Sequence, residues 1–242
     1  GNQFKYFVNP NLNDETGGII ISEPGDSASG SLVMLFKSKK TDHRYILKVT
    51  GLIRDDVLNV VRPMNFPELE CEIYKEVTKL VKKNITPHTF TLLNNSLNIK
   101  RITLPDNNYF RLEGLGRNVH YLSIMLNETS SGNSELYTLS KFINRKLIAY
   151  SDENILKIMY NILFQIIYTL EVFNRVGIMH NDLHIGNIFI VIKNNRFDQP
   201  NYRKTFRKYR FKSTDGTQYE MNLENIGFDV RIYDYDRSHK FG

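Results

Sequence analysis

The 242-residue sequence contains one cysteine, Cys71, and no tryptophan. A single cysteine cannot form an internal disulfide or a zinc site built from several cysteines, which points to a reducing compartment. No apolar run reaches the roughly 20 residues that cross a bilayer, and the first residues lack the pattern of a signal peptide. These absences predict an intracellular, cytoplasmic protein without a membrane partner.

The sequence nevertheless has ample material for a hydrophobic core, because 41% of its residues are hydrophobic and 12% are aromatic. Its length suits one large domain or two small ones. The formal net charge is +6. The segment Lys193–Lys212 alone carries eight Lys and Arg residues against one Asp, so the basic character belongs to this segment and not to the chain as a whole.

The first half of the chain is predicted to form strands and one helix. From Pro67 onward, apolar residues recur at spacings of three and four, which places them on one helical face; these are Leu69, Ile73, Val77 and Leu80. Short apolar or alternating runs predict strands; these are Gly18–Glu23, Leu32–Lys37, Arg44–Thr50, Tyr109–Leu112 and Val119–Leu126.

The second half is predicted to begin with a long helix. Ser151 is a typical helix start, an apolar stripe follows, and Gly177 fits the end of the helix. The β-branched run Ile188–Ile192 and the segment Phe228–Tyr233 are expected to be strands. Asp215–Gly216 is a typical hairpin turn, so a hairpin is expected to interrupt the chain between these two strands.

The most informative segment is His180-Asn-Asp-Leu-His-Ile-Gly-Asn187, which lies between the long helix and a strand. Asp182 and Asn187 are five residues apart in a turn, and Asp234 follows the next apolar strand. Carboxylate and amide oxygens suit a hard cation such as Mg²⁺. The spacing resembles the protein-kinase catalytic loop followed by a D-F-G-like aspartate. The chain therefore resembles the protein-kinase-like superfamily, in particular divergent serine/threonine kinases of large DNA viruses.

The resemblance implies a phosphate-covering loop in the first half. The run from Gly25 to Leu32 fits the pattern G-x-G-x-x-G-x-V, with Ser27 at the middle glycine and Gly30 at the third. Small residues there would allow backbone N–H groups to approach phosphate oxygens. The other candidate contacts to the nucleotide, Glu128 and Ser130, follow the strand that ends at Leu126 and are placed only by their order along the chain.

The resemblance also implies an ion pair. Lys48 lies in an apolar strand, sixteen residues after Leu32, and a buried lysine is costly unless it is paired. On the following helix, Glu70 precedes the apolar Ile73 by three residues and is the expected partner. Glu72 is the alternative partner, and an edge lysine beside a solvated acidic helix face is the simpler interpretation of the same residues.

The implied fold is α+β: a bilobal kinase-like fold with an N-lobe over residues 1–127 and a partial C-lobe over residues 128–242, with a hairpin insert at 193–226. In the implied mechanism, Lys48 contacts the phosphates of ATP, Asn187 and Asp234 hold Mg²⁺, and Asp182 accepts the proton of an acceptor hydroxyl. The expected activity is transfer of the γ-phosphate to serine or threonine of a protein substrate.

Two histidines flank the proposed base. His184 stands where ordinary kinases have a lysine near the γ-phosphate, and an imidazole supplies a weaker and pH-dependent positive charge. His180 is expected to support the loop by hydrogen bonding and not by ionising. His180, Asp182 and His184 together could instead form a metal cluster, because imidazole and carboxylate suit zinc or iron.

Three departures from the kinase pattern keep other functions open. Asn181 replaces an arginine, Asp236 replaces the glycine of D-F-G, and six residues follow Asp236 in this sequence. The alternatives are a small-molecule phosphotransferase of the aminoglycoside- or choline-kinase kind, favoured by L-H-x-G-N, and a nucleotide-binding pseudokinase. A second chain or a further C-terminal segment is expected to cover the C-lobe.

The basic segment 193–212 has two interpretations of its own. Aromatic residues alternate there with cations, a combination that binds single-stranded nucleic acid through stacking and phosphate contacts. The same alternation is typical of an exposed hairpin with one packed face, which is the preferred interpretation.

Overall fold

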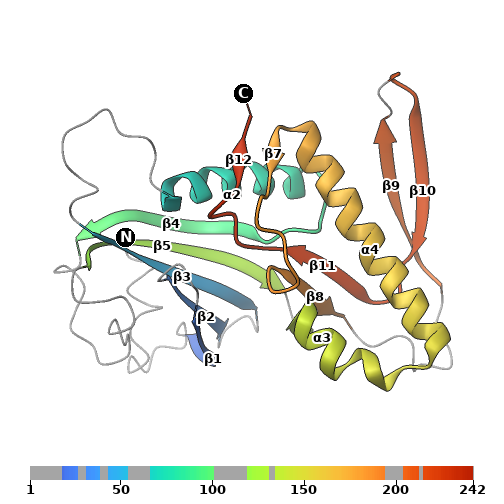
Figure 1. Cartoon of the computed structure of the whole chain (residues 1–242), viewed down its shortest axis with the longest axis horizontal. Helices are drawn as coiled ribbons and strands as arrows, with labels where there is room; N and C mark the ends of the chain where they lie inside the picture. The colour runs from blue at the N-terminus through green and yellow to red at the C-terminus, as the bar shows by residue number, and fades with distance from the viewer. Residues whose placement is uncertain are drawn as a thin grey trace.

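The computed structural model describes residues 18–26, 31–38, 43–53, 66–100, 119–130, 134–193, 204–212 and 215–241. Within these ranges the chain forms three α-helices, one 3-10 helix, and strands arranged in four small antiparallel sheets (Figure 1). The expected mixture of helices and antiparallel sheets is therefore confirmed.

The largest sheet is built from the first half of the chain. Its strand order is β1-β2-β3-β5-β4, with every neighbouring pair antiparallel. The bounds are β1 Gly18–Asp26, β2 Ser31–Ser38, β3 Arg44–Ile53, β4 Thr91–Lys100 and β5 Val119–Ser130. Four of the five strands were predicted and all four extend beyond their predicted bounds, whereas Tyr109–Leu112 lies outside the described residues. Pro24 fits within β1 because β1 is an edge strand with irregular pairing.

Strand β4 was not predicted, because its sequence T-L-L-N-N-S-L-N-I-K contains three asparagines, which strands generally disfavour. It forms because it pairs with β5 along the edge of the sheet. Helix α2, Phe66–Lys82, packs against β4 (Figure 1). The predicted periodicity is confirmed, since Ile73, Val77 and Leu80 are all buried.

The second half begins with β6, Glu135–Thr138, and the short helix α3, Leu139–Arg145, whose N-cap Thr138 accepts a hydrogen bond from the backbone N–H of Lys141. The 3-10 helix η4, Leu147–Ala149, and the long helix α4, Asp152–Arg175, follow. Apart from a hairpin, the strands of this half form two sheets, ordered β11-β8-β6 and β12-β7. Their bounds are β7 Ile178–Met179, β8 Ile188–Ile192, β11 Phe228–Ile232 and β12 His239–Lys240.

The predicted hairpin is present as β9, Phe206–Lys212, and β10, Gln218–Glu224, joined through Asp215 and Gly216. Gly216 has a positive φ of 89°, which the turn requires and glycine adopts freely. Tyr209 on β9 is buried against the rings of Phe164 and Tyr168 on α4, at 5.0 and 4.7 Å between ring centroids. The hairpin therefore has one packed face and stands beside α4 (Figure 1).

Both halves share one hydrophobic cluster, which includes residues of α2, α4, β8 and β11. A direct backbone connection joins them, because Ile232 N–H donates to His88 O at 2.9 Å and Phe90 N–H donates to Ile232 O at 3.4 Å. The segment before β4 and strand β11 consequently hold the end of α2 next to the second half of the chain.

Helix α4 is apolar on two faces. One face enters the core through residues such as Ile158 and Ile162, while the other carries an exposed stripe of Leu156, Tyr160, Leu163 and Ile167, each at least 50% exposed. Among the described residues, α4 alone is long and apolar enough to cross a membrane, and core helices of soluble proteins pass the same test.

Candidate functional site

Lys48 forms the centre of the candidate site. It lies on β3 and is 1% exposed, and its Nζ is 2.9 Å from Oε1 of Glu70 and 2.5 Å from Oδ1 of Asp234. Burial opposes a charge on Lys48, but the carboxylates of Glu70 and Asp234 outweigh it and raise the pKa of the lysine. Lys48 is therefore a permanent cation that joins the sheet, helix α2 and the segment after β11.

Glu70 is the partner that the helix periodicity predicted. Its side chain is 1% exposed; burial raises the pKa of its carboxyl and Lys48 opposes that rise. The alternative partner, Glu72, instead pairs with Lys75 at 2.6 Å on the surface of α2, where both side chains are more than 40% exposed. The choice between the two glutamates is thus settled by which helical face packs against the core.

The loop 180–187 is hydrogen-bonded to the segment that follows β11. Nε2 of His180 bonds to Tyr233 O at 3.0 Å, and Tyr233 N–H donates to Asn187 O at 3.0 Å. Farther along, the Ser238 hydroxyl donates to His180 O at 3.0 Å. These contacts place the loop directly beside Asp234, whose own backbone adopts a positive φ of 66°. Two segments about fifty residues apart in sequence therefore form one unit.

His180 supports this unit as the sequence predicted. It is 4% exposed, burial lowers its pKa, and the bond from Nε2 to Tyr233 O identifies Nε2 as the protonated nitrogen. Its Nδ1 is buried and has no hydrogen-bond partner. A neutral ring is consistent with both observations.

Asp182 and Asn187 are joined within the loop. The side-chain amide of Asn187 donates from Nδ2 to the backbone oxygen of Asp182 at 3.0 Å, which leaves Oδ1 of Asn187 as the atom that could meet a cation. The Asp182 side chain is 29% exposed, and Nη1 of Arg237 lies 3.8 Å from its Oδ1. Asp182 thus has a fixed backbone and a carboxylate that solvent, and a substrate, can reach.

His184 is exposed, and its orientation is set by its own loop. Gly186 N–H donates to Nδ1 of His184 at 3.0 Å, so Nδ1 is an acceptor and the neutral ring carries its proton on Nε2. A Cβ atom on Gly186 would lie 2.8 Å from Cε1 and 2.9 Å from Nδ1 of that ring. Glycine is therefore needed at position 186 for the His184 ring to keep this position.

Asp236 belongs to the site, although the sequence suggested it only as a departure from the kinase pattern. Its Oδ1 is buried without a hydrogen-bond partner. Burial raises the pKa of its carboxyl, and the nearby charges of Asp234 and Asp182 raise it further. The sequence pattern Asp-Tyr-Asp could have identified Asp236 as a site residue, because it places a second carboxylate two residues after Asp234 and close to the end of a strand.

The predicted nucleotide-covering residues are only partly described. Ser27 and Gly30 lie outside the described residues, while Gly25 and Leu32 lie on paired strands β1 and β2. Glu128 and Ser130 were expected after a strand but lie within β5, which continues to Ser130 because it remains paired with β3. The carboxylate of Glu128 also contacts Nδ1 of His43 at 3.1 Å.

The alternative metal cluster of His180, Asp182 and His184 is not formed. No group of three or more His, Cys, Asp or Glu side chains in the described part of the chain is arranged to hold a metal ion. The physical reason is the loop conformation, which directs Nε2 of His180 to a backbone oxygen and Nδ1 of His184 to a backbone N–H.

Comparison with known proteins finds similarity at the level of solved structures. A crystal structure described as a kinase domain is similar over 92% of this chain and 51% of its own, with 15% sequence identity and a TM-score of 0.40. This chain therefore spans about half the length of that chain. No protein-family model matches the sequence, and no curated protein matches it.

Proposed function

We propose that this protein is an ATP- and Mg²⁺-dependent phosphotransferase with a two-lobed, protein-kinase-like fold divided near residue 127. The observation that carries the proposal is the position of Lys48, whose ammonium contacts Glu70 on α2 and Asp234 after β11. Three residues from three distant segments meet in the arrangement that phosphate binding and metal binding both require.

The chemistry of Lys48 supports a phosphate-binding role. An ammonium group has three N–H donors, and two of them are directed to Glu70 and Asp234. The third donor would bind a phosphate oxygen of ATP. Glu70 keeps the ammonium in place because both side chains are almost completely buried and neither can turn to solvent.

The residues around Asp234 fit a magnesium ion. Mg²⁺ prefers carboxylate and amide oxygens, and Asp234, Asn187 and Asp236 supply both kinds. The buried Oδ1 of Asp236, which has no hydrogen-bond partner, is the kind of atom that a bound cation would satisfy. Magnesium bound there would neutralise charge on the transferred phosphate.

Asp182 is proposed as the base that accepts the proton of the acceptor hydroxyl. Its carboxylate is accessible, and the bond from Asn187 to its backbone oxygen keeps it in position. Positioning of the hydroxyl would contribute most of the catalysis. The proposed acceptor is serine or threonine of a protein substrate. The alternative acceptor is a small-molecule alcohol, which the sequence L-H-x-G-N of the loop favours.

Transfer of radiolabelled phosphate from ATP in the presence of Mg²⁺ tests this proposal. Acidic and basic proteins, an aminoglycoside and choline would serve as acceptors. Asp182→Ala and Asp234→Ala are expected to abolish transfer, while Glu171→Gln on the exposed surface of α4 serves as the control. Transfer that survives both aspartate substitutions would refute the proposed site.

Nucleotide binding separates an active enzyme from a pseudokinase. Lys48→Met is expected to weaken ATP binding at least tenfold, because it removes the phosphate contact. Wild-type protein that binds ATP through Lys48 but transfers phosphate to no acceptor, water included, would identify a pseudokinase. The double variant Lys48→Met with Glu70→Gln controls for the unpaired carboxylate that the single variant leaves buried.

A further inference from the structure

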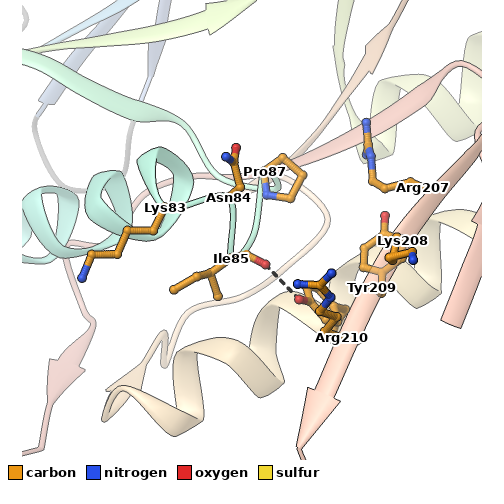
Figure 2. A pocket seen from close by; sticks show the side chains of 9 residues that line it. Lys83, Asn84, Ile85, Pro87, Arg207, Lys208, Tyr209 and Arg210 are labelled. Atoms are coloured by element: carbon orange, nitrogen blue, oxygen red, sulfur yellow. Dashed lines mark hydrogen bonds between the residues drawn. The ribbon is translucent and has the colours of Figure 1, made fainter. Parts of the chain in front are cut away.

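A second site candidate is a basic pocket beyond the C-terminal end of α2, which none of the proposed catalytic residues lines. Its volume is about 600 Å³, and it lies between the segment after α2, helix α4 and strand β9 (Figure 2). Lys83 lines it from the end of α2, and three cations line it from β9: Arg207, Lys208 and Arg210. Segments about 120 residues apart in the sequence therefore contribute four cationic residues to the lining of one pocket.

The charges of this pocket are only partly neutralised. No carboxylate among the described residues lines it. Behind the lining, Glu220 contacts both Lys208 at 2.7 Å and Arg210 at 3.5 Å. Asp229 contacts Arg207 at 2.7 Å, and it is shared with Lys193 at 2.9 Å, outside the pocket. Counted over the described part of the chain, two carboxylates pair with four lining cations, which leaves an excess of about two positive charges.

The pocket also has an apolar wall and a fixed shape. Ile85 and Pro87 line it, and Ile85 is 41% exposed although it is a large apolar residue. The hydroxyl of Tyr168 donates to Ile85 O at 2.8 Å, and the hydroxyl of Tyr209 bonds to Nε2 of buried His88 at 2.9 Å. These bonds join the segment after α2 to α4 and to the hairpin, so the walls are held in place before any ligand arrives.

We propose that this pocket binds a phosphate monoester dianion that carries an apolar body. A phosphate monoester has a charge of about −1.5 to −2 at pH 7 and three acceptor oxygens, which match the excess charge and the Lys and Arg donors. The apolar body would lie against Ile85 and Pro87. A phosphodiester carries one negative charge per phosphate, so a nucleic acid backbone matches the pocket less well. The inference is independent of the proposed phosphotransferase site.

Titration of the whole protein with phenyl phosphate, followed by amide NMR shifts, tests the proposal. Shifts are expected in residues 83–88 and 207–210, with weaker binding of inorganic phosphate and of phenol. Affinity is expected to fall between pH 7.5 and pH 5.5, because the second pKa of a phosphate monoester is about 6. A short peptide with phosphotyrosine, compared with its unphosphorylated form, shows whether a phosphorylated protein can supply the same group.

A pair of matched double variants makes the test specific. Lys83→Gln with Arg210→Gln removes two pocket charges, and Lys204→Gln with Lys212→Gln removes two charges from the hairpin outside the pocket. All four side chains are exposed, so the melting temperature should stay the same in both variants. The first variant is expected to weaken phenyl phosphate binding at least tenfold and the second less than twofold.

Three results would overturn the proposal. Equal weakening by the two double variants would mean that only the general charge of the hairpin attracts anions. Shifts confined to residues outside 83–88 and 207–210 would place binding elsewhere. An oligothymidine that competes more strongly than phenyl phosphate at the same total phosphate would identify a nucleic-acid surface instead.

Discussion

The carboxylate of Asp229 connects the basic hairpin to the core, and its replacement by asparagine is the most informative change for this half of the chain. Asp229 lies on β11 and is 3% exposed. Its two oxygens accept hydrogen bonds from Nη1 of Arg207 at 2.7 Å and from Nζ of Lys193 at 2.9 Å. Asparagine keeps the shape but replaces one acceptor with an amide that donates, so one cation would face a donor.

The expected loss of stability follows from the exposure of the partners. Breaking a fully buried ion pair costs about 3–5 kcal/mol. The Lys193 side chain is 49% exposed and can turn to solvent, so its bond contributes only about 0–1 kcal/mol. Arg207 is 28% exposed and regains part of its hydration. We therefore expect Asp229→Asn to cost about 2–3 kcal/mol, or about 4–12 °C in melting temperature for a chain of this size.

The pKa of Asp229 determines how the stability difference between wild type and Asp229→Asn changes with pH. Burial raises the pKa of Asp229, but Arg207, Arg231 and Lys193 outweigh burial and hold the pKa well below its ordinary value of 3.8. Such a carboxyl stabilises the fold fully above its unfolded pKa and loses that contribution as the pH falls toward its folded pKa. The difference between wild type and Asp229→Asn should be equal at pH 7 and pH 5 and smaller at pH 3.

Urea unfolding at these three pH values measures the effect. Glu220→Gln is the matched control, because Glu220 also bridges two cations, Lys208 and Arg210, but does so on the exposed face of the hairpin. The control variant Glu220→Gln is expected to unfold at the same urea concentration as the wild type. If Asp229→Asn unfolds at the same urea concentration as wild type at pH 7, or if the difference at pH 3 equals that at pH 7, the reasoning is wrong.

Two further changes test the loop and the exposed face of α4. Gly186→Ala is expected to displace the His184 ring and shift its Cε1–H proton signal with little change in melting temperature, because the added Cβ would lie within 3 Å of ring atoms; an unchanged signal would contradict the described contact. Leu163→Glu with Ile167→Glu should change the stability of a monomer by less than about 1 kcal/mol, because both side chains are at least half exposed. A melting temperature lowered by more than about 5 °C, together with a smaller mass in sedimentation equilibrium, would show that a second copy covers this face.

The elements that the sequence predicted are those whose own periodicity decides their structure. Helices α2 and α4 show apolar residues at helical spacing, β8 is a short β-branched run, and β11 has an apolar residue at every second position, so each could be identified without its neighbours. Strand β4 could not be identified, because its asparagine-rich sequence becomes a strand only through pairing with β5. The extension of β5 to Ser130 has the same cause, since pairing with β3 continues past the end of the apolar run.

The residues of the candidate site also differ in whether the local sequence could predict their contacts. The contact of Lys48 with Glu70 was predictable, because a lysine in an apolar strand needs a partner and only one face of α2 packs inward. The burial of Asp236 was not, because it depends on how the segment after β11 lies against the loop 180–187. The basic pocket depends still more on tertiary structure. Tyr209 packs against Tyr168 of α4, and this contact brings β9 close to the segment after α2, so that residues of both line one pocket. The packing of Tyr209 against α4 agrees with the preferred interpretation of the basic segment, an exposed hairpin with one packed face, and the same packing brings residues of that hairpin to the lining of the pocket.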